Sequence, residues 1–158
     1  MSEAQQPTFG IQKIYLKDMS LEIPNAPQIF LERESPQVDV SLHNEARPLG
    51  QPGLFEVVLT ITVTAKINDK TVFLVETAQA GIFEIVNVSQ QETEAVLGIV
   101  CPSTLLPYAR EAIASTVTRA GFPPVVLQHM SFETIYQQQQ AQLQQQPQPP
   151  QPGTPPAH

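Results

Sequence analysis

The sequence predicts an α+β fold in which a four-stranded antiparallel sheet is followed by a long helix and a second, C-terminal helix. Three observations predict it. Apolar residues recur with a period of two through the first half of the chain, and with helical spacing in the second half. The residues Asn68 to Lys70 separate two of the strand-like segments and favour a tight hairpin. Strands that precede helices, rather than alternating with them, are typical of α+β domains.

The first three extended segments differ in how regularly they alternate. The first, residues 11–22, mixes apolar and polar side chains on both faces and ends where Pro24 and Pro27 remove backbone donors. The second, residues 38–43, alternates regularly, and the third, residues 54–67, is almost perfect. Regular alternation predicts one buried face for each of these two strands.

The fourth extended segment, residues 71–88, is long and apolar on both faces near its end. Gly81 is a candidate for a bulge or bend within it. Two helices can cover only one face of a four-stranded sheet. The surplus of apolar surface therefore predicts that the chain associates with other copies of itself.

The helical half begins with a short helix over residues 91–99, which Pro102 is expected to end. Either Ser103 or Thr104 can cap a new helix, and Gly121 is a natural C-terminal cap for it. The apolar stripe of this long helix has helical spacing and consists of Leu106, Ala109, Ile113, Thr116 and Val117.

The remaining chain divides into a connector, a last helix and a tail. Ser131 follows an extended apolar connector and can cap the last helix, whose apolar positions are Phe132, Ile135, Tyr136 and Leu143. Residues 144–158 are rich in Gln and Pro and are expected to be disordered. We therefore predict a flexible N-terminus over residues 1–8, one folded domain over residues 9–143, and a disordered tail.

Composition restricts the classes of partner. The net charge is −7, which disfavours nucleic acid and anionic membranes because phosphate groups require Lys and Arg. No apolar run approaches the roughly 20 residues of a membrane helix, so direct insertion into a membrane is not expected. The first residues do not resemble a secretory signal, and the single cysteine fits a reducing compartment. These features predict a cytoplasmic protein with basic partners.

The sequence contains no pattern that we would assign to catalysis, a metal or another cofactor. The three histidines are far apart, and Cys101 has no partner at the spacing that metal sites require. There is no glycine-rich phosphate loop. Cys101 and His129 could form a nucleophilic pair in a small α+β enzyme, but a buried structural thiol is the more common situation. The chain is therefore expected not to be an enzyme.

Two surfaces remain as candidates for binding. Apolar residues of the second segment, the connector and the last helix could form an exposed site or ordinary core, at about even odds. Asp18 and Glu22 share one face of the first segment, and Leu74 and Glu76 share one face of the fourth. If these strands are neighbours, the four residues form an acidic patch, although a solvated sheet face is the simpler explanation from the pattern alone.

Several motifs together resemble the SecB family of bacterial protein-export chaperones. They are "FGIQKIYLKDMSLEIPNAP" near the N-terminus, "EVVLTITVTA" in the third segment, "GIFEI" in the fourth, and "LGIVCPSTLLPYAREAIASTVTRAGFPPVVL" in the helical half. The resemblance covers almost all of residues 9–143, and the Gln/Pro-rich tail departs from it. It implies an ATP-independent chaperone that holds preproteins unfolded and delivers them to the SecA motor, assembled as a homotetramer, a dimer of dimers.

The resemblance also implies roles for particular positions. The SecA-binding residues would be Asp18, Glu22, Leu74 and Glu76, and their partner would be the zinc-bearing C-terminal segment of SecA. Val75 and Thr77 would form the tetramer contact. Unfolded clients would bind to Val38, Val40, Leu42, Phe122, Val126, Leu127, Met130, Phe132, Ile135 and Tyr136. A chaperone of the same fold that serves other clients, such as a toxin–antitoxin pair, is the alternative.

Overall fold

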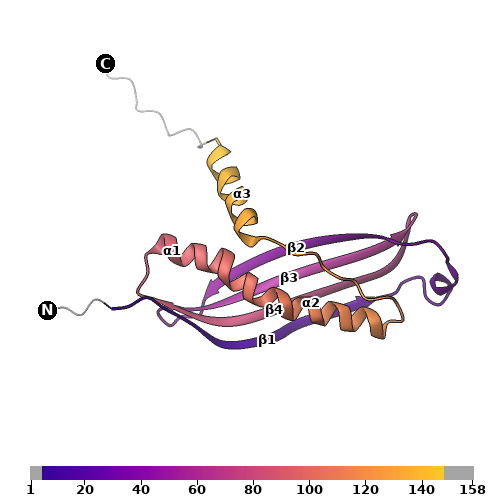
Figure 1. Ribbon diagram of the computed structural model, residues 1–158, viewed down its shortest axis with the longest axis horizontal. Helices are drawn as coiled ribbons and strands as arrows, with labels where there is room; N and C mark the ends of the chain where they lie inside the picture. The colour runs from indigo at the N-terminus through magenta and orange to yellow at the C-terminus, as the bar shows by residue number, and fades with distance from the viewer. Residues whose placement is uncertain (1–4, 148–158) are drawn as a thin grey trace, which may run out of the picture.

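The computed structural model describes residues 5–147 and confirms the predicted fold class. Four strands form one antiparallel sheet in the order β1-β4-β3-β2 (Figure 1). The strands are β1 (Thr8–Glu22), β2 (Gln37–Pro48), β3 (Leu54–Ile67) and β4 (Lys70–Val86), and a short 3₁₀ helix, η1 (Gln28–Leu31), lies between β1 and β2. The helical half consists of α1 (Gln90–Ala95), η2 (Val96–Val100), α2 (Cys101–Arg119) and α3 (Phe132–Gln145).

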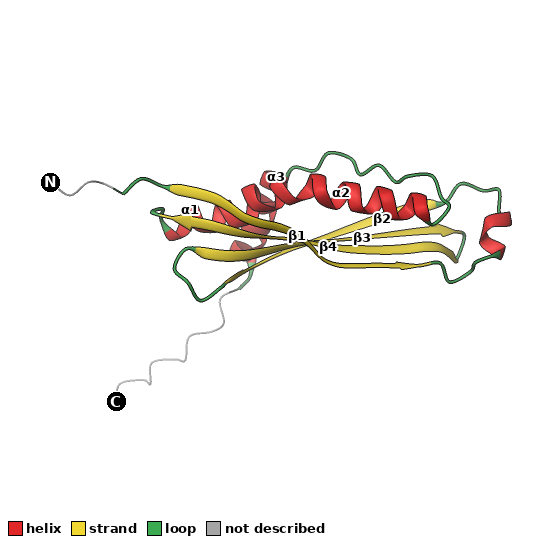
Figure 2. Ribbon diagram, turned by 90° about the horizontal axis from the view of Figure 1, so that it is seen from below, coloured by secondary structure: helices red, strands yellow, loops and turns green. Residues whose placement is uncertain are grey.

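The long helix α2 lies on one side of the sheet, which we call the inner face (Figure 2). It packs mainly on β4 and β3. The alternation of β3 decides this arrangement, because its inner side chains from Val57 to Ile67 are apolar and buried, while most of its outer ones are partly exposed. We call the opposite side of the sheet the outer face.

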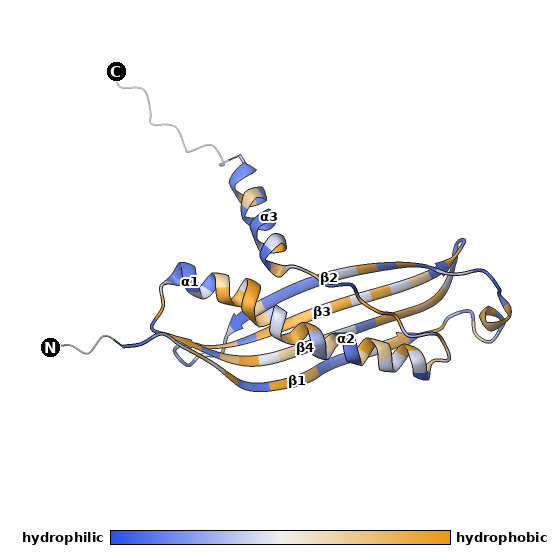
Figure 3. Cartoon of the chain, in the orientation of Figure 1, coloured by the Kyte–Doolittle hydropathy of each residue, from blue (hydrophilic) through white to orange (hydrophobic). Residues whose placement is uncertain are grey.

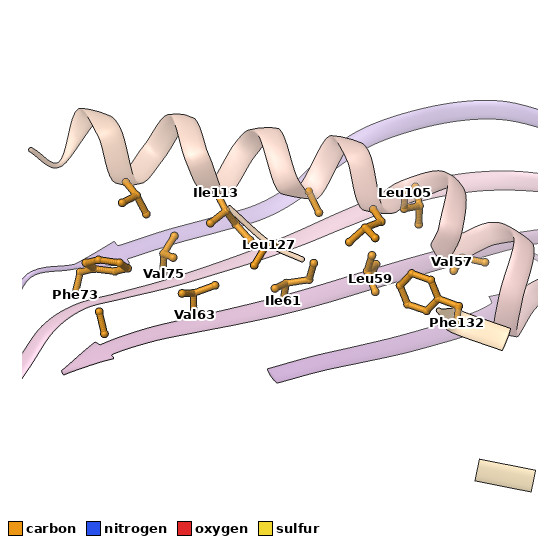
Figure 4. Packing of buried hydrophobic residues seen from close by; sticks show 14 of the residues in the cluster. Val57, Leu59, Ile61, Val63, Phe73, Val75, Leu105, Ile113, Leu127 and Phe132 are labelled. Carbon is orange, nitrogen blue, oxygen red and sulfur yellow. The ribbon is translucent and has the colours of Figure 1, made fainter. Parts of the chain in front are cut away.

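The core lies between α2 and the two central strands (Figure 4). From β3 it contains Val57, Leu59, Ile61, Val63 and Ala65, and from α2 it contains Leu105, Leu106, Ala109, Ile113 and Val117. Burial of each large aliphatic side chain contributes roughly 2 kcal/mol. Four members of the stripe predicted for α2 are in this core, and the fifth, Thr116, is partly exposed.

Two bulges explain why neither face of the first strand looks apolar in the sequence. The register of β1 against β4 shifts between Ile11 and Lys13 and again between Leu16 and Asp18. Each extra residue exchanges the faces of all positions beyond it. The inner face of β1 therefore carries Ile11, Ile14, Leu16, Met19 and Leu21, which no single parity in the sequence would group.

The bulge suspected at Gly81 is not present in β4. Gly81 pairs with Ile14 on one side and with Val57 on the other, and β4 itself has no extra residue there. Parity is therefore maintained to the end of the strand, and Phe83 and Ile85 are buried on the inner face. The predicted hairpin before β4 is confirmed, with Asn68 at φ 53°.

The prediction that Pro102 ends one helix and that Ser103 or Thr104 caps another is wrong. Residues 90–119 are helical throughout, and η2 is a π-helical turn that connects α1 to α2. The Ser103 and Thr104 hydroxyls donate to the carbonyls of Ile99 and Val100 instead, at 2.6 and 2.8 Å.

The wider hydrogen-bond ring of the π turn allows the helix to pass through a proline. Cys101 donates to the carbonyl five residues earlier, so the next donor in this pattern would be Pro102, which has no N–H. The carbonyl of Leu97 is left without its helical partner, and the side-chain amide of Asn44 donates to it at 3.1 Å. A side chain on β2 therefore completes the helix.

The predicted C-terminal cap of α2 and the predicted N-terminal cap of α3 are confirmed. Gly121 has φ +95°, and the backbone of Phe122 donates to Val117 across it, as in a Schellman cap. The Ser131 hydroxyl accepts from the backbone of Thr134 at the start of α3. This helix is hydrophobic in its first turn and mostly hydrophilic beyond (Figure 3).

The secondary structure extends slightly beyond the predicted folded region, residues 9–143, at both ends. β1 begins at Thr8, and α3 continues to Gln145, two residues into the predicted tail. Residues 1–4 of the predicted flexible N-terminus and residues 148–158 of the predicted tail lie outside the described residues.

Candidate binding surfaces

The outer face brings together the four residues predicted as an acidic patch. β1 and β4 are hydrogen-bonded neighbours, and Glu22 lies directly opposite Leu74. Glu76 is opposite Ser20 two pairs along, and Asp18 is opposite Ala78 two pairs further. Asp18 and Glu22 are exposed, while Leu74 and Glu76 are partly exposed. We call Asp18, Glu22, Leu74 and Glu76 the acidic surface.

Next to the acidic surface, Glu56 of β3 is a buried carboxylate with three partners. Its side chain is 7% exposed, and its Oε1 atom lies 2.9 Å from both Lys17 Nζ and Arg47 Nε. The Tyr15 hydroxyl donates to the other oxygen, Oε2. Tyr15 and Lys17 are on β1 and Arg47 is on β2, so Glu56 links three strands across β4. Periodicity in the sequence does not predict this cluster, because its members lie on three different strands.

These contacts determine which groups are charged. Hydrogen bonds from Tyr15 and Lys17, with a smaller contribution from Arg47, lower the pKa of Glu56 to about 2, despite its burial. Burial, and then the hydrogen bond to Glu56, raises the pKa of Tyr15 to about 12. Glu56 is therefore a carboxylate and Tyr15 a neutral donor at any physiological pH.

The lowered pKa of Glu56 predicts a loss of stability in acid. The unfolded carboxyl has an ordinary pKa of 4.5, so the unfolded state takes up the proton first, and the contribution of Glu56 is lost as the pH falls from 4.5 towards 2. The Glu56→Gln variant lacks this dependence. Denaturant unfolding at several pH values should therefore give a shallower acid slope for Glu56→Gln than for the wild type. The exposed Glu45→Gln variant is the control, and equal slopes for all three proteins would contradict the prediction.

On the inner side, a groove of about 960 Å³ lies between η1, the start of β2 and the connector that follows α2. Six of the ten residues predicted to bind clients line it: Val38, Val40, Phe122, Val126, Leu127 and Met130. We call this cavity the apolar groove. Val38 and Val40 are on β2, which is an edge strand of the sheet.

Aromatic rings form one wall of the apolar groove. Phe122 lies between Phe30 and Phe73, with ring centroids 5.0 and 5.1 Å away. Phe30 is 47% exposed, and Val126 of the connector, which also lines the groove, is 78% exposed. Sequence reasoning missed Ile29 and Phe30, because both follow a proline-rich turn and belong to no strand pattern. The available signal was that Ile29 and Phe30 are apolar although their segment has no place in the sheet.

The other four predicted client residues do not line the groove. Phe132 is buried at 2% exposure and anchors the first turn of α3. The ring of Tyr136 packs so closely on Gly98 of η2 that a Cβ atom at Gly98 would lie 2.6 Å from it. Leu42 and Ile135 pack against the core and are partly buried. Leu127 lines the groove but is itself buried, so it holds the connector in place.

Val75 and Thr77, predicted as a tetramer contact, are completely buried on the inner face within one chain. The Thr77 hydroxyl has no hydrogen-bond partner among the described residues. Neither side chain offers a surface to a second copy. Any influence on assembly would act through the position of α2, which covers β4.

The structure does not favour nucleophilic chemistry at Cys101. The thiol is fully buried, and burial raises the pKa of Cys101 to about 12, so it is protonated at neutral pH. His129 is exposed on the connector. Within residues 5–147 no cluster of three metal-binding side chains occurs. In the same part of the chain, no helix has the length and apolarity needed to cross a membrane.

Comparison with known proteins identifies the family. The family model described as preprotein translocase subunit SecB matches residues 2–143. The chain is 59% identical over 138 residues to the protein-export protein SecB of Methylobacillus flagellatus, covering 87% of each chain. It is 56% identical over 138 residues to that of Dechloromonas aromatica, covering 87% of this chain and 90% of the relative.

A solved structure supports the fold. A SecB-like chaperone of Mycobacterium tuberculosis, in complex with a peptide from the HigA1 antitoxin, superimposes with a TM-score of 0.64. The match covers 78% of this chain and 91% of the other, at 19% identity. From the family match over residues 2–143 and the relatives above 50% identity, we conclude that the chain belongs to the SecB family of protein-export proteins.

Proposed function

We propose that this protein holds unfolded preproteins in the apolar groove and delivers them to SecA through the acidic surface. The observation that supports this proposal best is the arrangement of two chemically different surfaces on opposite faces of one sheet. The groove lies on the inner side, and the acidic surface lies on the outer face. A client and a basic partner could therefore be bound at the same time. The proposal needs no cofactor and no catalytic step, as befits a chaperone family.

The chemistry of the groove suits unfolded chains. Aromatic and aliphatic side chains accept apolar client residues without reading a sequence. β2 borders the groove and has a free edge, so it could also pair with the backbone of an extended client. Several weak contacts along one client chain would retain it by avidity.

The acidic surface suits a basic partner. Glu22 lies opposite Leu74, and Glu76 lies two positions along the same strand, so a partner with Lys or Arg beside an apolar residue would be complementary. We assign it to the zinc-bearing C-terminal segment of SecA, in which the zinc belongs to SecA. Delivery to SecA places the chain in the cytoplasm, where preproteins are made.

The proposed assembly is a homotetramer, a dimer of dimers. On the inner face, Phe9, Ile11 and Leu16 of β1 are 43–51% exposed, because α2 covers the central strands instead. Leu16 lines a second cavity of about 400 Å³ together with Tyr108, which is on α2. β1 is also an edge strand with one neighbour in the chain. An apolar strip beside an unpaired edge is the kind of surface that copies of a chain bury in assemblies.

The proposal is tested by native mass and by refolding. Light scattering should give a mass close to four chains. At a molar excess the protein should slow refolding of a preprotein from denaturant. The mature form of the same protein should refold faster than the preprotein under these conditions. A stable monomer that does not delay preprotein refolding would contradict the proposal. Delayed folding of an antitoxin, with no effect on preproteins, would favour the alternative class of client.

A further inference from the structure

The direction in which Asp18 points depends on one irregularity in β1. Leu16 pairs with Gln79 and Asp18 pairs with Ala78, so Lys17 is an extra residue between them. Along a regular strand successive side chains alternate between faces, but at this bulge two successive side chains lie on one side. Lys17 and Asp18 therefore both lie on the outer face.

The bulge matters because it reconciles two parts of the outer face. Tyr15 is on the outer face, where it bonds to Glu56. Asp18 is three positions later, so a regular strand would place it on the inner face. With the extra residue, Asp18 lies on the same side as Glu22 and completes the acidic surface.

The bulge is held by a contact on each face. On the outer face Lys17 Nζ lies 2.9 Å from Oε1 of Glu56, a residue that is 5% exposed. On the inner face the side-chain amide of Gln79, also 5% exposed, donates to the carbonyl of Tyr15 at 3.1 Å. Two nearly buried side chains, from β3 and β4, therefore hold the Lys17 side chain and the backbone that precedes it.

We infer that Lys17, through its bond to Glu56, is a positioning residue for Asp18 on the acidic surface. It does not contact the partner in this role, but it stabilises the bulge that presents the Asp18 carboxylate. Gln79 supports the same bulge from the inner face. The inference rests on the proposed function of the acidic surface.

Arg47 provides a matched control for Lys17. Both residues bond the same oxygen of Glu56 at 2.9 Å, and both side chains are largely solvent-accessible, at 42% for Lys17 and 63% for Arg47. Arg47 lies on β2, in a regular part of its pairing with β3, so its loss leaves the bulge intact. Lys17→Met and Arg47→Met each remove one positive charge. Charge alone predicts tighter binding of a basic partner by both variants.

The test measures binding of a zinc-loaded peptide of the SecA C-terminal segment by calorimetry. We expect Lys17→Met to weaken binding about fivefold and Arg47→Met to leave it unchanged or tighter. Lys17→Arg should restore binding. Gln79→Met changes no charge and should weaken binding in the same direction. In an Asp18→Asn background, Lys17→Met should have no further effect, because the group that it positions is absent.

Two results would overturn the inference. One is wild-type or tighter binding by both Lys17→Met and Gln79→Met. The other is a Lys17→Met effect that persists in full in the Asp18→Asn background. Client binding in the apolar groove serves as the folding control and should be unchanged. If the wild type itself does not bind the peptide, the proposed function of the acidic surface fails, and the inference fails with it.

Discussion

The triple variant Asp18→Asn, Glu22→Gln, Glu76→Gln should bind SecA about a hundredfold more weakly than the wild type, because each lost charge-assisted contact at an exposed site contributes roughly 1 kcal/mol. The amides keep the size and polarity of the side chains. In the wild type the Thr62 hydroxyl donates to Glu76 at 2.7 Å, and an amide oxygen at position 76 can still accept this bond. Calorimetry with purified SecA measures the effect, and the wild-type affinity should fall as salt is added.

A charge-matched variant distinguishes the acidic surface from net charge. Glu45→Gln, Glu84→Gln, Glu94→Gln also removes three carboxylates, but none of them belongs to the acidic surface. This control should bind SecA within about threefold of the wild type, because long-range fields are largely screened at physiological salt. The assignment would be wrong if both triple variants weakened SecA binding equally. Both should still bind unfolded clients.

The double variant Val40→Asp, Val126→Asp should weaken binding of unfolded clients by about fiftyfold or more, because a client that enters the groove would desolvate two unpaired charges. Both valines line the apolar groove, and they are 41% and 78% exposed, so the substitutions should cost little folding stability. The delay that the variant imposes on preprotein refolding measures its client binding.

The control for the groove adds the same charge elsewhere. Leu143→Asp, Gln139→Glu places two carboxylates on α3, where Leu143 is 63% exposed and outside the groove lining. Its effect on preprotein refolding should match that of the wild type. If this variant lost as much client binding as the groove variant, negative charge in general would be responsible, and the groove would not be the client site.

The first strand shows where sequence periodicity stops being informative. From Asp18 to Glu22 the parity of the sequence gives the correct face, because that part of β1 pairs regularly with β4. Before Lys17 the same parity is inverted, and it changes again at Gln12. A bulge leaves no periodic trace, since its cause is a set of contacts with other strands. At Lys17 those contacts come from Glu56 and Gln79.

The apolar groove was predicted in part for a similar reason. Val38, Val40 and the connector are apolar without an evident place in the core, which is a local property of the sequence. Whether such a residue is exposed depends on its neighbours. Phe132 and Leu127 look like Val126 in the sequence, yet they are buried against the core, while Phe30 lines the groove from η1.

The sequence by itself determined the α+β class, the hairpin, the C-terminal cap of α2 and the N-terminal cap of α3, because these depend on periodicity and on turn chemistry within short stretches of the chain. Tertiary structure alone decided the continuity of the helix through Pro102, where Asn44 of β2 supplies a missing donor. It also decided the faces of β1 and the cluster around Glu56. The physical reason is the same in each case: the stabilising partner is a side chain on another strand, and its distance along the chain removes it from any local pattern.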